Sequence, residues 1–160
     1  MASPFFFMAK KDGKLQLCQD YRYLNEHTIK NAYLIPNVQS ILDKLRESKY
    51  FTAMDVRLRY NNICIQKQDR WKEAFRTNQE LFKSTVMFFR MCNSLATFQT
   101  MMNTIFMPLI AKNLILVYMD DILIYTPTKK QLHKMMKEIL KILQEHDLYL
   151  KPEKYQFTKQ

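Results

Sequence analysis

Tyr118-Met119-Asp120-Asp121 lies inside a strongly apolar run, Leu114 to Tyr125, which these two adjacent carboxylates interrupt. Burying an unpaired carboxylate is costly, so a pair of acids in such a run is typical of a tight turn that faces a cleft. The pattern predicts two strands, Leu114 to Met119 and Ile122 to Tyr125, that meet at the acids as a β-hairpin. The alternative is an ordinary polar hairpin turn, because aspartate is a common turn residue.

A third carboxylate stands at the end of another apolar strand. Lys49 to Met54 has the pattern of a strand, and Asp55 follows it directly. If this strand lies beside the hairpin, three carboxylates converge on one edge of the sheet. Carboxylate oxygens are the ligands that hard divalent cations prefer. Two such ions can stabilise the attacking and leaving oxygens of a phosphoryl displacement, so the pattern indicates phosphoryl-transfer chemistry.

The rest of the chain supplies a mixed set of elements. Strand-like runs at Ser3 to Lys10 and Lys14 to Tyr21 flank Asp12-Gly13, a strong hairpin signal. With the three strands above, the order predicts an α+β fold, an antiparallel sheet with helices on one face. The other predicted elements are a short helix with Pro36 in its first turn (then Ile41, Leu42 and Leu45), a strand at Tyr60 to Ile65, a strand pair at Trp71 to Arg76 and Leu81 to Phe88, a helix from about Ser94 to Leu109, a final helix lined by Leu132 to Leu143 and capped by Thr126 or Thr128, and a last strand.

The composition limits the classes of protein to which the chain can belong. The 160 residues are 48% apolar, which suits one domain with a real core. No apolar run reaches the roughly 18 residues of a membrane span, and the N-terminus lacks the charged region of a signal peptide. Cys18, Cys64 and Cys92 form no metal or redox pattern. We therefore expect an intracellular protein of the cytoplasm or nucleus, neither secreted nor bound to a membrane.

Two further features of composition stand out. The net charge of +10 is large for this length and indicates a polyanionic partner, with a merely soluble basic protein as the alternative. The chain has one glycine, Gly13, where average usage predicts roughly eleven. A fold with several hairpins normally needs glycine at left-handed backbone positions.

Taken together, the motifs resemble the fingers and palm of the reverse transcriptase of gypsy-type LTR retrotransposons. The resemblance implies a right-hand polymerase palm with part of the fingers and no thumb. It implies a single domain over residues 1–160, partly fingers at 1–48 and about 61–93, and palm at 49–60 and 94–160. The matching stretches are Phe7 to Lys11 with Asp12-Gly13, Asp20-Tyr21-Arg22 with Leu24-Asn25, Ile29-Lys30-Asn31, Tyr50 to Asp55, Tyr60-Asn61-Asn62, Trp71-Lys72 with Ala74 to Thr77, Ala96-Thr97-Phe98-Gln99, Tyr118 to Tyr125, and Lys151 to Lys154.

The resemblance also implies an activity, RNA-directed DNA polymerisation by nucleotidyl transfer to a primer 3′-hydroxyl. Asp55, Asp120 and Asp121 would be the catalytic carboxylates that bind two Mg²⁺ (or Mn²⁺) ions, with Asp121 the least directly coordinated. The implied partners are an RNA template, a DNA primer and dNTPs.

Other residues receive roles from the same resemblance, each beside an alternative. Tyr60 matches the aromatic gate that rejects a ribose 2′-hydroxyl, or is a core tyrosine. Lys10 matches a lysine near the incoming triphosphate, or is a solvated hairpin lysine. The nucleotide-binding set also includes Val56, and the template and primer set comprises Arg22, Asn25, Tyr118 and Met119, although Arg22 could simply pair with Asp20.

The chain departs from the family pattern at several positions. Arg59 and Arg90 stand where the family has glycine, Leu95 where it has proline, and Gln16 where it commonly has arginine. Three further departures from common family residues are Glu80 in place of glycine, Leu34 in place of proline, and Tyr155 in place of cysteine. Each of these types of change can arise by one C-to-T change on one DNA strand or the other, which predicts a transition-rich copy of an element. Ordinary divergence is the alternative. A side chain in a left-handed backbone costs about 1 to 2 kcal/mol. We also expect Arg59 and Arg90 to intrude where nucleotide and template must fit.

These departures leave two functions in contention. One is the polymerase domain of a retrotransposon in a truncated and degenerate copy, because the chain stops where the family continues into the thumb. The other is a catalytically inactive remnant that acts at most as a non-specific basic nucleic-acid-binding domain. Retention of Asp55, Asp120 and Asp121 favours the first, and Arg59, Arg90 and Gln16 favour the second.

Overall fold

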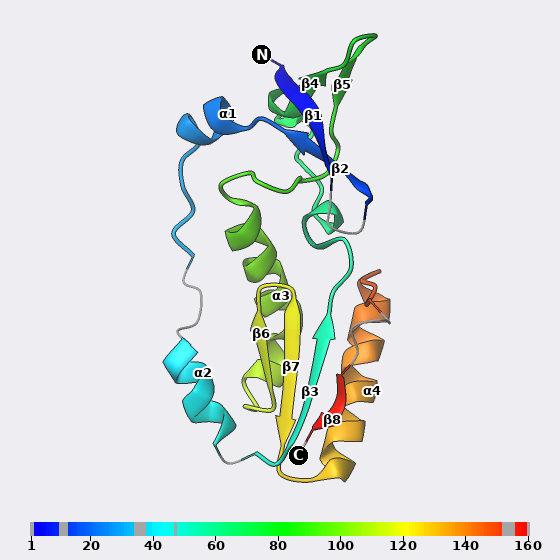
Figure 1. Cartoon of the computed structure of the whole chain (residues 1–160). Coiled ribbons are helices and arrows are strands. Elements are labelled where there is room, and N and C mark those ends of the chain that lie inside the picture. Colours follow the sequence, from blue (N-terminus) through cyan, green and yellow to red (C-terminus); the bar gives the residue numbers. More distant parts are fainter. Residues whose placement is uncertain (1, 10–12, 34–37, 47, 152–155, 160) are drawn as a thin grey trace. The chain divides into compact units, whose positions relative to one another are not determined.

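The computed structural model describes residues 2–9, 13–33, 38–46, 48–151 and 156–159 (Figure 1). The chain forms two compact units. The first consists of Met1–Asn31 and Tyr60–Ser94, and the second of Ala32–Arg59 and Leu95–Gln160. We call them unit 1 and unit 2 and describe each by itself.

Unit 2 is built on a four-stranded antiparallel sheet in the order β6-β7-β3-β8. Its strands are β3 (Tyr50–Asp55), β6 (Ile115–Tyr118), β7 (Asp121–Thr126) and β8 (Gln156–Lys159). Its helices are α2 (Val38–Leu45), α3 (Ser94–Ile110) and α4 (Lys129–Glu145). Of the two threonines predicted to cap α4, Thr128 is the cap, because its hydroxyl accepts the N–H of Gln131 at 3.4 Å.

The two faces of this sheet differ in burial. Strand register places Met54, Ile122 and Val117 in one row on one face, and all three side chains are buried. The opposite face is more open along its middle, where Ala53 and Leu123 are half-buried. Apolar side chains of α3 and α4 complete the core, and α4 packs against β7 and β3. The predicted α+β arrangement, an antiparallel sheet with helices on one face, is confirmed.

Unit 1 carries a second four-stranded sheet in the order β2-β1-β4-β5. Its strands are β1 (Ser3–Ala9), β2 (Leu15–Gln19), β4 (Ala74–Arg76) and β5 (Leu81–Lys83). β1 and β2 form the predicted hairpin, and Gly13 in the connection has a φ of 76°, as a glycine turn allows. A short helix that was not predicted, α1 (Arg22–Glu26), follows β2.

Two strand predictions in unit 1 and at its boundary are wrong. Tyr60 to Ile65 is no strand: Arg59–Asn62 forms the 3₁₀ helix η1, and the N–H of Ile63 bonds back to the carbonyl of Tyr60 at 3.0 Å. Two adjacent asparagines disfavour a strand there. Arg70–Glu73 forms a second 3₁₀ helix, η2, so the predicted strand from Trp71 shortens to β4. Within the described residues, no helix is long and apolar enough to cross a membrane.

Candidate metal centre

The Asp-Asp hairpin forms as predicted, with its turn shifted by one residue. Tyr118 pairs with Asp121 across the β6–β7 ladder, so Met119 and Asp120 make the two-residue loop and Asp121 begins β7. Met119 has a φ of 57°, a conformation that ordinary side chains adopt at a cost. Such a loop turns the chain sharply enough to project Asp120 beyond the end of the sheet.

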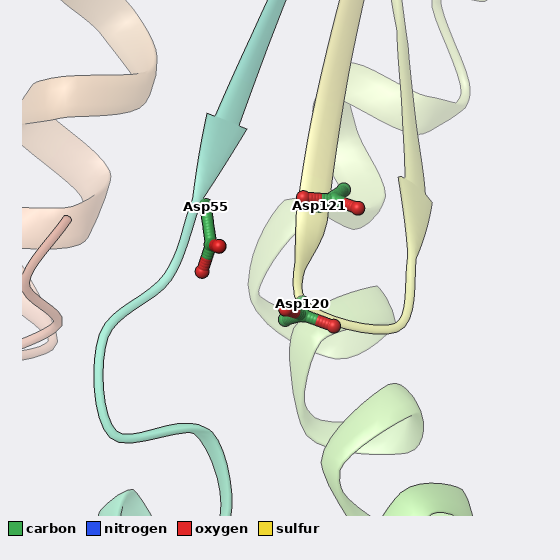
Figure 2. Close-up of side chains that lie close together, drawn as sticks. All are labelled: Asp55, Asp120 and Asp121. Carbon is green, nitrogen blue, oxygen red and sulfur yellow. The ribbon is translucent and has the colours of Figure 1, made fainter. Parts of the chain in front are cut away.

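β3 brings the third carboxylate to the same place. Asp55 stands directly opposite Asp121 in the β3–β7 ladder, so both side chains project from the more open face of the sheet. The N–H of Val56 donates to the carbonyl of Asp120 at 2.9 Å and ties the end of β3 to the loop. One carboxylate oxygen from each of the three aspartates lies within 4.8 Å of the other two (Figure 2). The predicted convergence is confirmed.

A buried amide holds the strained loop in place. Gln99 of α3 is fully buried; its Oε1 accepts the N–H of Met119 at 2.7 Å, and its Nε2 donates to the carbonyl of Val117 at 3.0 Å. One side chain therefore bonds the backbone on both sides of Tyr118. Reasoning from the sequence matched Gln99 to a family motif but gave it no role. Its position on the buried stripe of α3, four residues after Leu95 and three before Met102, was the available signal.

Basic side chains pair with Asp120 and Asp55. A terminal nitrogen of Arg59 (Nη2) lies 2.5 Å from Asp120 Oδ2, and Lys151 Nζ lies 2.6 Å from Asp55 Oδ1. The carboxylates of Asp120 and Asp55 are nearly buried, with 9% and 7% of each side chain exposed. Buried carboxylates need such charge-assisted partners. The cluster thus attracts positive charge, and its hard oxygen donors fit a divalent cation such as Mg²⁺.

Of the positions where the family has glycine, Arg90 has the expected left-handed backbone and Arg59 does not, and the expected intrusion of both side chains on nucleotide and template stays a prediction. Arg90 has a φ of 77°, so a side chain does occupy a left-handed backbone there. Arg59 is not among the described residues with positive φ; the strained neighbour is Leu58, with a φ of 58°. The consequence of Arg59 is therefore an ion pair with Asp120 rather than backbone strain.

The other candidate residues lie in varied surroundings. Val56 is fully buried, and Tyr118 and Met119 are half-buried on the hairpin. Tyr60 is half-buried in η1 and belongs to unit 1. Lys10 lies outside the described residues, as do Leu34 and Tyr155 among the departures.

In unit 1, the proposed template residues make contacts within the fold. Arg22 binds Asp20 through a short ion pair of 2.6 Å, and this guanidinium holds the pKa of Asp20 down at about 2. Asn25 donates to the carbonyl of Arg90 at 2.9 Å and accepts the N–H of Cys92 at 2.8 Å. Asn25 therefore supports the loop that contains the strained arginine.

Comparisons with known proteins agree on one family. The model of the family described as "Reverse transcriptase (RNA-dependent DNA polymerase)" matches residues 8–160. The Transposon Tf2-3 polyprotein of Schizosaccharomyces pombe is 33% identical over 156 residues, 98% of this chain and 12% of the polyprotein. An RNA-directed DNA polymerase homolog of Oenothera berteroana is 34% identical over 135 residues, 84% of this chain and 94% of the homolog.

The fold has close counterparts among solved structures. The foamy viral protease-reverse transcriptase in complex with an RNA/DNA hybrid superposes with a TM-score of 0.86 at 24% identity. The match covers 98% of this chain and 21% of the viral one. The predicted polymerase fold, a palm with part of the fingers, is thereby confirmed.

Proposed function

The chain belongs to the reverse transcriptase family of gypsy-type LTR retrotransposons, and we propose that its inherited reaction is RNA-directed DNA synthesis. In this reaction a primer 3′-hydroxyl attacks the α-phosphate of a dNTP, and pyrophosphate leaves. The observation that carries the proposal is the convergence of Asp55, Asp120 and Asp121 within 4.8 Å. The chain spans 12% of the polyprotein that it resembles, so the activity of the whole protein is part of the proposal.

Members of the family generally use divalent metal ions, and we assign Mg²⁺ or Mn²⁺ to the three aspartates. When bound, such ions would stabilise the attacking and leaving oxygens of the displacement. The chain's own contribution is to hold the carboxylates in place. Gln99 fixes the loop that carries Asp120, and the β3–β7 ladder sets Asp55 opposite Asp121. The backbone that carries the three carboxylates therefore needs little reorganisation when the site is used.

The roles of the remaining residues are proposed on the family pattern. Tyr118 and Met119 adjoin the catalytic acids in the hairpin, which supports a place under the primer terminus. Asn25 acts on the template side indirectly, because it supports the Arg90 loop. The net charge of +10 supports a nucleic-acid partner. The full proposed set is Lys10, Val56 and Tyr60 for the dNTP, and Arg22, Asn25, Tyr118 and Met119 for template and primer.

Primer extension tests this proposal. The purified chain, with an RNA template, a labelled DNA primer, dNTPs and Mg²⁺, should elongate the primer. Asp120→Asn should abolish elongation, because an amide cannot supply the anionic oxygen that holds the ion. Arg46→Gln, an exposed change in unit 2, should leave it unchanged. Elongation that survives Asp120→Asn would refute the assignment.

A second function is favoured by the ion pair between Arg59 and Asp120 and by the strain at Arg90. A chain of this kind would be inactive and would bind nucleic acid through its basic surface alone. Fluorescence anisotropy should then show weak binding without sequence preference, falling steeply from about 50 to 200 mM salt. Salt-insensitive binding would contradict a phosphate-driven contact, and robust primer extension would exclude the inactive remnant.

A further inference from the structure

We propose that Arg59 is a tethered cation that competes with divalent metal ions for Asp120 and thereby sets the metal affinity of the centre. This inference rests on the proposed function, because it takes the three aspartates as the metal ligands. It adds a determinant that lies outside the carboxylates themselves. The geometry of one contact carries it: Arg59 Nη2 lies 2.5 Å from Asp120 Oδ2.

The contact places Arg59 on an oxygen that a metal ion would use. Mg²⁺ binds carboxylate oxygens at about 2.0 to 2.1 Å. An ion on Asp120 Oδ2 would therefore lie within a few ångströms of the guanidinium. At such separations like charges repel strongly, even with substantial screening. Binding of the ion and retention of the Arg59 contact thus oppose each other.

The formal charges of the three aspartates, Arg59 and Lys151 lead to the same conclusion. Three carboxylates, one guanidinium and one ammonium lie together, and these five side chains carry a formal charge of −1. Without Arg59 the remaining four would carry −2. The electrostatic attraction for a divalent ion therefore rises when the guanidinium leaves.

Arg59 is better suited than Lys151 to give up its carboxylate to a metal ion. Its side chain is 39% exposed, on a long flexible stem, and Leu58 before it is 59% exposed. Lys151 is 24% exposed, and its own N–H donates to the carbonyl of Asp55 at 3.0 Å, so its backbone is fixed beside its partner. Arg59 can thus swing into solvent without breaking a backbone contact of the ladder. Its attachment four residues after Asp55 keeps its effective concentration at the centre high.

The test is a titration of the free chain with Mn²⁺, followed by electron paramagnetic resonance, without nucleic acid or nucleotide. Arg59→Gln and Arg59→Gly should each lower the Mn²⁺ dissociation constant at least about tenfold. Arg59→Lys keeps the charge and should stay within about threefold of the parent chain. Arg46→Gln changes the net charge equally at an exposed site and should have no effect. Circular dichroism confirms that each variant is folded, and using two neutral variants protects the test against one that does not fold.

The outcomes separate this inference from the proposed function. If Asp120→Asn removes Mn²⁺ binding but neither neutral variant tightens it, the role of Arg59 is wrong and the metal centre stands. If Asp120→Asn leaves binding unchanged, or if no variant binds Mn²⁺, both the role of Arg59 and the metal centre are wrong. Equal tightening by Arg46→Gln would show that overall charge, rather than the contact with Asp120, sets the affinity.

Discussion

Unit 2 and unit 1 each contain a four-stranded sheet, but the two units differ in how many large side chains they bury. The largest fully buried side chains of the described residues, among them Phe98, Phe106 and Ile124, all belong to unit 2. In unit 1 the buried apolar side chains are fewer; they include Tyr21 and Met87 beside the small Cys18 and Ala74. Its exposed large apolar side chains are Phe6, Phe7, Met8, Leu15, Tyr23, Ile29, Trp71, Leu81, Phe82 and Phe89.

This difference matters because the candidate metal centre lies within unit 2. Asp55, Asp120 and Asp121 depend on the β3–β7 ladder and on Gln99, which all belong to the well-packed unit. Gln16, Glu80 and Arg90, three of the departures from the family pattern, belong to unit 1. These three departures therefore lie outside the unit that holds the acidic centre, whereas Arg59 and Leu95 lie inside it.

Hydrogen exchange should show the largest contrast. Amides of β3 and β7 should exchange at least about 100-fold more slowly than those of β1 and β2, because local opening of a poorly packed sheet costs several kcal/mol less. Exchange measured by NMR or mass spectrometry at residue or peptide level reads this directly. Equal protection in the two sheets would show that the units unfold together. The difference in packing would then not change the free energy of local opening.

Core truncation should show the next largest effect. Ile124→Ala, at a fully buried site of β7, should cost about 2 to 5 kcal/mol in the free energy of unfolding. Leu15→Ala, at a site of β2 that is 66% exposed, should change it by no more than about 0.5 kcal/mol. Urea unfolding followed by circular dichroism gives both values. A large loss from Leu15→Ala would mean that the exposed apolar face of unit 1 is covered in solution.

The same contrast explains which elements could be predicted from the sequence. The Asp-Asp hairpin and helices α3 and α4 carry long or unambiguous apolar patterns, and all three were predicted. The 3₁₀ helices η1 and η2 were predicted as strands, because a few alternating apolar residues fit a strand and a single helical turn equally well. These errors fall in or beside unit 1, where burial gives a weaker pattern to read.

The candidate site was predictable only in part. Asp55, Asp120 and Asp121 could be named because each ends an apolar strand or interrupts an apolar run. The contacts of Gln99 with the loop and of Arg59 with Asp120 depend on how α3 and η1 are placed in three dimensions. No local pattern encodes such placement. For this reason the ion pair of Arg59 with Asp120 was not predicted, and the expected intrusion of Arg59 on nucleotide and template stays a prediction.

Relief of backbone strain tests whether the difference between the units extends to single turns. Arg90→Gly in unit 1 and Leu58→Gly in unit 2 remove exposed side chains from backbones with φ of 77° and 58°. Each should stabilise the chain by roughly 0.5 to 1 kcal/mol, because relief of about 1 to 2 kcal/mol exceeds the entropy that glycine adds to the unfolded state. Arg76→Gly, in strand β4, should destabilise instead. If only one of the two glycine variants is more stable than the parent, the cost of the left-handed backbone depends on the packing of the unit that contains it.

The smallest effect concerns a carboxyl buried in the core of unit 1. Glu73 is 3% exposed, its Oε2 has no hydrogen-bond partner among the described residues, and burial raises its pKa. The folded chain therefore holds this proton more tightly than the unfolded chain, so stability must fall as the pH rises above the ordinary glutamate range. Asp20 does not contribute to the loss of stability between about pH 5 and pH 7.5, because its pKa of about 2 lies well below this range and it stays ionised throughout.

Glu73→Gln should remove this part of the pH dependence, because an amide keeps the shape of the carboxyl without ionising. The thermal unfolding midpoint of the parent chain should drop from about pH 5 to pH 7.5 by more than that of Glu73→Gln. Glu26→Gln, an exposed change in α1 of the same unit, should follow the parent chain. If Glu73→Gln and the parent show the same slope, Glu73 is ionised without penalty and unit 1 admits water to its centre. If the unfolding midpoint of the parent falls more steeply with pH than that of Glu73→Gln, ionised Glu73 is an uncompensated charge in unit 1. Part of the stability that the chain loses toward neutral pH would then be electrostatic in origin.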